Sequence, residues 1–102
     1  MIILDDNNYN EVTANGVVVV DFYADWCGPC KMMAPVFEEA QAAYEGRAVF
    51  AKVNVDTSKE IAMKNSIMGI PTLFFFKNGE IVDRVSGVLD KGTFYSKIDS
   101  LL

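Results

Sequence analysis

The run Val17–Tyr23 (VVVVDFY) constrains the fold of this chain more than any other stretch. It opens with four successive valines, and Asp21 is its only charged residue. β-Branched and aromatic residues favour extended backbone, and apolar side chains on both faces are typical of a strand inside a parallel sheet. The run therefore predicts a buried central strand that requires a covering layer on each side.

Helical and extended patterns alternate along the rest of the chain. They predict strands over 2–4, 17–23, 48–55, 72–77 and 80–85, and helices over 7–14, 29–44, 58–65 and from residue 91 to the C-terminus. Asn78-Gly79 predicts a tight hairpin between the last two strands, whereas strands joined through a helix run parallel. We therefore expect an α/β fold in which one mixed five-stranded sheet carries helices on both faces.

Size and charge exclude several functions. The 102 residues suit a single domain over 1–102, and we expect a monomer. The net charge of −5 and the absence of a basic cluster argue against nucleic acid or an anionic membrane as partner. No apolar run could span a bilayer, and the N-terminus turns acidic at Asp5-Asp6 instead of resembling a secretory signal. We expect a cytoplasmic protein.

The residues available for chemistry are few. The chain has no histidine, which excludes Ser-His-Asp and Cys-His catalysis and every histidine-ligated metal site. Its two cysteines, Cys27 and Cys30, cannot complete a four-cysteine zinc site within one chain. We expect neither a metal nor a cofactor.

The strongest motif is the segment Trp26-Cys27-Gly28-Pro29-Cys30, which follows the buried strand and opens a predicted helix. Unpaired backbone N–H groups and the helix dipole at that position favour a thiolate, the reactive form of cysteine. Two thiols three positions apart across the first turn can also form a disulfide with little backbone movement. In a reducing compartment this context predicts reversible dithiol–disulfide exchange.

Two structural alternatives explain the cysteines less well. A disulfide closing a four-residue loop stabilises a fold by about 2 kcal/mol, far less than one closing a long loop. A zinc site shared between two chains would need further ligands, and none is evident near the rigid Gly28-Pro29 turn.

Several motifs together resemble the thioredoxin family over nearly the whole chain. They are Val20-Asp21-Phe22, Trp26 to Met32, Ala34-Pro35, Lys52 to Asp56, Gly69 to Thr72 and Phe76 to Glu80. Their order makes the resemblance far more specific than two spaced cysteines. Tyr23 stands where many family members have a tryptophan, and we expect this to alter packing and fluorescence but not the chemistry.

The resemblance gives Asp21 and Lys52 a role. Asp21 is either a structural core carboxylate held by hydrogen bonds or, as in the family, the proton acceptor for Cys30. Burial would raise its pKa towards the range of a thiol. The resemblance places the Lys52 ammonium nearby, where it would partly offset that rise.

The resemblance also implies a cis peptide bond at Pro71, facing the cysteines. The backbone of Ile70 could then pair with an extended substrate as an added strand. We expect an apolar docking surface around it, which suits protein partners. Its predicted members are Trp26, Gly28, Pro29, Met68, Ile70, Gly87 and Val88.

The sequence thus favours a protein-disulfide reductase, in which Cys27 attacks and Cys30 resolves. By resemblance, an NADPH-dependent thioredoxin reductase would restore the dithiol. Two alternatives are an oxidant or isomerase of the same fold and a binding subunit that does not use its cysteines. Gly28-Pro29 argues against the oxidant, because it offers the Cys27 thiolate little extra stabilisation and so favours the disulfide state.

Overall fold

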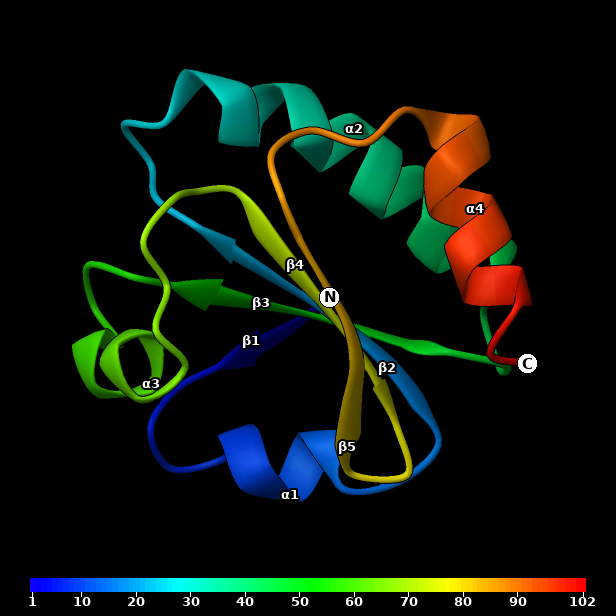
Figure 1. Ribbon diagram of the computed structural model, residues 1–102, viewed down its shortest axis with the longest axis horizontal. Coiled ribbons are helices and arrows are strands. Elements are labelled where there is room, and N and C mark those ends of the chain that lie inside the picture. The colour runs from blue at the N-terminus through cyan, green and yellow to red at the C-terminus, as the bar shows by residue number, and fades with distance from the viewer.

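The computed structural model describes all residues 1–102 and confirms the alternation of strands and helices (Figure 1). The elements follow in the order β1 (Ile2–Leu4), α1 (Tyr9–Thr13), β2 (Val17–Tyr23), α2 (Gly28–Ala43), β3 (Val49–Asn54), α3 (Lys59–Lys64), β4 (Thr72–Lys77), β5 (Glu80–Ser86) and α4 (Lys91–Asp99). Each predicted element is present, with ends that differ by a few residues.

The five strands form one mixed sheet in the order β1-β3-β2-β4-β5. β1 and β2 both run parallel to β3, while β4 runs antiparallel to β2 and to β5. The buried strand predicted from the valine run is therefore parallel to one neighbour only. It nevertheless lies at the centre of the sheet, with every residue up to Phe22 buried.

Helices cover both faces of the sheet, as predicted (Figure 1). On one face α2 and α4 pack against an aromatic cluster that includes Phe37, Phe75 and Phe94. On the other face α1 and α3 cover a second cluster, which includes Phe22 and Phe74. Alternation along β2 sends Val19 to the first cluster and Val18 and Val20 to the second. Asp21 therefore faces α2.

Local signals fix the ends of these elements. Asn78 and Gly79 form the predicted β4–β5 turn, and both have the positive φ angles that a two-residue hairpin turn requires. The Asp90 side chain accepts a hydrogen bond from the Thr93 N–H and begins α4. The helix α2 continues through Pro35 and ends before Gly46, which has a φ of 82°. The N-terminus of α2 thus lies directly after the central strand.

Candidate active site

The two cysteines lie where β2 leads into α2. Cys27 is the N-cap of α2 and Cys30 lies in its first turn, with Pro29 between them. Their Cα atoms are 5.2 Å apart and their sulfur atoms form a disulfide. The backbone N–H of Cys30 donates a hydrogen bond to Cys27 Sγ over 3.2 Å. This contact favours negative charge on Cys27 once the disulfide is reduced.

Overall exposure does not separate the two cysteines. Each residue is only 4% exposed in the disulfide state. The two differ in the cavity that each borders. Cys27 lines a large apolar cleft, whereas Cys30 lines a smaller cavity on the side of Lys52. The asymmetry therefore lies in what can approach each sulfur.

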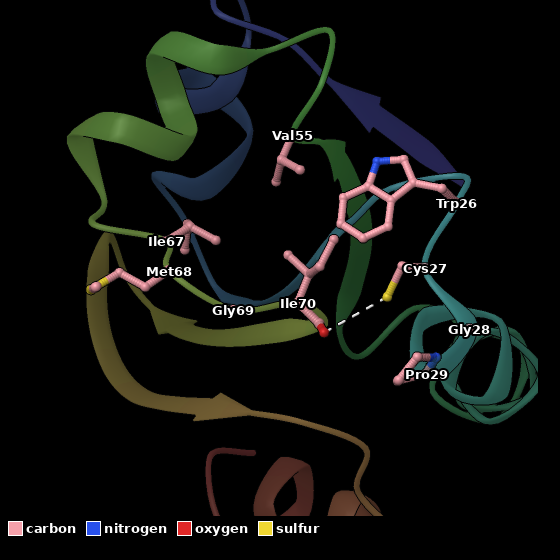
Figure 2. Close-up of a pocket in the computed structure, with 9 residues that line it drawn as sticks. All are labelled: Trp26, Cys27, Gly28, Pro29, Val55, Ile67, Met68, Gly69 and Ile70. Atoms are coloured by element: carbon pink, nitrogen blue, oxygen red, sulfur yellow. Dashed lines mark hydrogen bonds between the residues drawn. The ribbon is translucent and has the colours of Figure 1, made fainter.

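The cleft beside Cys27 has a volume of about 440 Å³ (Figure 2). Its walls come from the loop that leads into α2 and the first residues of that helix, from the residue after β3, and from the segment before β4. The lining residues are Trp26, Cys27, Gly28, Pro29, Val55, Ile67, Met68, Gly69 and Ile70. The sequence predicted all of these except Val55, Ile67 and Gly69. Gly69 and Val55 lie inside motifs that carry the family resemblance, close in sequence to Ile70 and Lys52. Their position in these motifs was the signal that could have identified them as site residues.

The carbonyl oxygen of Ile70 points at the sulfur of Cys27, 3.7 Å away (Figure 2). The Ile70–Pro71 peptide bond is cis, as the resemblance implied. Gly87 lies next to Pro71, because its N–H donates to the Pro71 carbonyl over 2.8 Å. However, neither Gly87 nor the half-exposed Val88 lines the cleft. These two predicted docking residues lie after β5, outside the cleft wall.

Trp26 forms an exposed wall of the cleft next to Cys27. Its side chain is 70% exposed, yet Nε1 donates a hydrogen bond to Asp56 Oδ2 over 2.8 Å. This bond fixes the indole over the cleft entrance. Sequence reasoning gave Asp56 no role, because it lies 30 positions from Trp26 and only the fold brings them together.

Asp21 is the buried acid of the site. It is 1% exposed, and no protein group donates a hydrogen bond to either of its carboxylate oxygens. The alternative of a core carboxylate held by hydrogen bonds therefore finds no support. Burial raises the pKa of Asp21 to about 6, and the charge of Lys52 lowers it in part. An acid with a pKa near 6 can exchange protons close to neutral pH.

Lys52 is the register partner of Asp21 on β3. The two side chains form no ion pair within 4.0 Å; the ion pairs of the protein involve other residues. Instead, the Lys52 Nζ lies 5.1 Å from the centroid of the Tyr23 ring. Lys52, Tyr23 and Cys30 share the walls of a cavity of about 170 Å³, which also includes Ala24, Asp25, Lys31 and Ala34.

A metal site would require a group of acidic or cysteine side chains, and a membrane span would require a long apolar helix. No group of three or more acidic or cysteine side chains could hold a metal ion. None of the helices combines the length and the apolar character needed to cross a bilayer.

A mixed sheet between helical layers, with a cysteine pair capping a helix beside an apolar cleft, defines a dithiol–disulfide oxidoreductase. Comparison with known proteins is consistent with this class. The family model for thioredoxin matches residues 1–100. A thioredoxin of Staphylococcus haemolyticus is 46% identical over 97 residues, which cover 95% of this chain and 93% of that protein. A thioredoxin of Staphylococcus aureus is 45% identical with the same coverage. The chain belongs to the thioredoxin family. Membership implies disulfide substrates and a reductase as general partners.

Proposed function

We propose that this protein is a general protein-disulfide reductase in which Cys27 is the attacking thiolate and Cys30 the resolving thiol. The observation that carries the proposal is the position of Cys27 Sγ. This sulfur lies at the wall of the apolar cleft, 3.7 Å from the Ile70 carbonyl oxygen, and accepts a hydrogen bond from the Cys30 N–H. A substrate in the cleft meets Cys27 before Cys30.

The first step forms a mixed disulfide. The Cys27 thiolate attacks one sulfur of the substrate disulfide, the substrate S–S bond breaks, and the other substrate sulfur leaves as a thiolate. The Ile70 carbonyl accepts no backbone N–H from the protein itself, so it can accept one from an extended polypeptide, which would align the substrate disulfide with Cys27. Pro71 holds this carbonyl in place, and Trp26, Gly28 and Pro29 provide apolar contact with the substrate.

The second step releases the substrate. Asp21 takes the proton of Cys30, and the resulting thiolate attacks Cys27 Sγ and breaks the mixed disulfide. The second substrate sulfur leaves and takes up a proton. The substrate gains two electrons and the cysteine pair loses two. The Lys52 ammonium stabilises ionised Asp21, which keeps the acid available as a base near pH 7.

The physiological setting follows from the same chemistry. A reductase of this type needs its dithiol restored, and we propose an NADPH-dependent thioredoxin reductase for that task. We further propose a monomeric protein acting in the cytoplasm on protein disulfides. The apolar cleft supports protein over small polar substrates. Gly87 and Val88 would extend contact with larger substrates beyond the cleft.

Trapping of the intermediate tests the order of attack. Cys30→Ser keeps the nucleophile and removes the resolving thiol, so a disulfide-bearing substrate should stay attached through Cys27 on a non-reducing gel. The matched variant Cys27→Ser should trap none. Equal trapping by both variants would rule out a fixed attacking thiol.

A further inference from the structure

We infer that Tyr23 is a positioning residue for the second step: its ring holds the Lys52 ammonium beside Asp21 on the wall of the cavity that borders Cys30. This inference rests on the proposed proton transfer from Cys30 to Asp21. It revises our expectation from the sequence that the residue at position 23 does not affect the chemistry.

The geometry begins with the sheet. Asp21 and Tyr23 are two positions apart on β2 and therefore point to the same face. Lys52 is directly opposite Asp21 on β3, which makes Tyr23 its diagonal neighbour on that face. Tyr23 also packs against the small cluster formed by Ala24, Cys27 and Cys30. Tyr23 thus contacts both the cysteine cluster and Lys52.

The Lys52 ammonium has no carboxylate within 4.0 Å to hold it. A long, flexible side chain of this kind would otherwise extend into solvent, where its charge acts weakly on a buried acid. The Tyr23 ring lies 5.1 Å from Nζ, within the range of a cation–π contact. The ring therefore holds the ammonium where a carboxylate partner otherwise would. Because the ring is uncharged, it does not neutralise the ammonium, whose charge can still act on Asp21.

The other groups around Asp21 do not substitute for Lys52. On the β4 side the register partner of Asp21 is the apolar residue Leu73. The cavity that Tyr23 and Lys52 line also has Cys30 and Lys31 from α2 and Asp25 from the preceding loop on its walls. The charge that lowers the pKa of Asp21 is that of Lys52.

Removing the Tyr23 ring would also admit water to the cavity, and this alone would change the pKa of Asp21. A double-mutant cycle separates that change from the one caused by release of the Lys52 ammonium. Tyr23→Leu removes the ring and keeps an apolar side chain. It should move the NMR titration of the Asp21 carboxyl to higher pH, because the ammonium is released. In a Lys52→Gln background the same substitution should produce no such upward movement, since no ammonium remains to be held. Tyr23→Phe, which keeps the ring, should retain the wild-type titration.

The rate of the second step provides a functional readout. An interaction of cation–π strength moves a titration by about half a pH unit, so Tyr23→Leu should slow mixed-disulfide release about twofold at pH 6. At pH 8.5, where Asp21 is ionised in either case, the rate should be unchanged. Equal effects of Tyr23→Leu with and without Lys52, or at both pH values, would overturn the inference.

Two measurements distinguish failure of the proposed role of Asp21 from failure of the Tyr23–Lys52 contact. If Asp21→Asn leaves mixed-disulfide release unchanged, the proposed role of Asp21 fails, whatever the titration cycle shows. In the unmodified protein, the Lys52 ε-methylene protons should be shifted upfield by the ring current of Tyr23. Random-coil shifts for these protons would refute the contact without any variant having to fold.

Discussion

Replacing Asp21 with asparagine should stabilise the protein at every pH above about 3.8, where the aspartate ionises in the unfolded chain. The folded pKa of Asp21 is about 6, against an ordinary value of 3.8. Because the folded pKa is raised, the unfolded chain loses this proton first, and native stability falls as the pH rises from about 3.8 to 6. At 1.36 kcal/mol per pKa unit, the total loss is about 3 kcal/mol above pH 7.

Asparagine has nearly the same shape as the protonated acid and does not ionise. The gain in unfolding free energy should therefore be about 3 kcal/mol at pH 8 and about 1 kcal/mol at pH 4.5, where the unfolded chain is already largely ionised. The difference of about 2 kcal/mol between the two pH values is independent of any constant effect of the amide. Denaturant unfolding of the disulfide form, monitored by circular dichroism, measures it.

A matched control removes one exposed carboxylate elsewhere. Glu45 lies on the surface just after α2, and Glu45→Gln should change stability by less than about 0.5 kcal/mol at either pH. Equal stabilisation by Asp21→Asn at both pH values would refute desolvation as the cause. A destabilised Asp21→Asn at pH 8 would refute it as well.

Three further predictions follow from the site and the core. In the reduced protein, brief alkylation at neutral pH followed by mass mapping should show that Cys27 is labelled first. Cys27 borders the large cleft, and its sulfur accepts a hydrogen bond from the Cys30 N–H. Preferential labelling of Cys30 would reverse their roles. Asp56→Ala should release the indole of Trp26, the only tryptophan. This should change the intrinsic fluorescence and raise the KM for a protein disulfide, and an unchanged spectrum and KM would contradict the prediction. Phe94→Ala should cost about 3–5 kcal/mol in denaturant unfolding, because Phe94 is fully buried against other aromatic rings, and a loss below 1 kcal/mol would mean that the cluster repacks.

Much of the fold could be predicted because its signals are local. The valine run, the Asn78-Gly79 turn and the Asp90 cap each act through neighbouring backbone, so their residues define strand, hairpin and helix start without the rest of the chain. The direction of the strand beside β2 was harder to predict. An apolar run on both faces reports burial, and burial is the same whether a neighbouring strand is parallel or antiparallel.

The sequence by itself determined the chemistry available to this protein. Without histidine, and with two cysteines at the start of a helix, thiol–disulfide exchange is the chemistry that its residues support best. The tertiary structure decided what surrounds that pair. Ile70, Asp56 and Lys52 lie 43, 30 and 31 positions from the residues that they approach, namely Cys27, Trp26 and Asp21. Contacts at such separations depend on strand order and register, and these emerge only when the whole sheet forms.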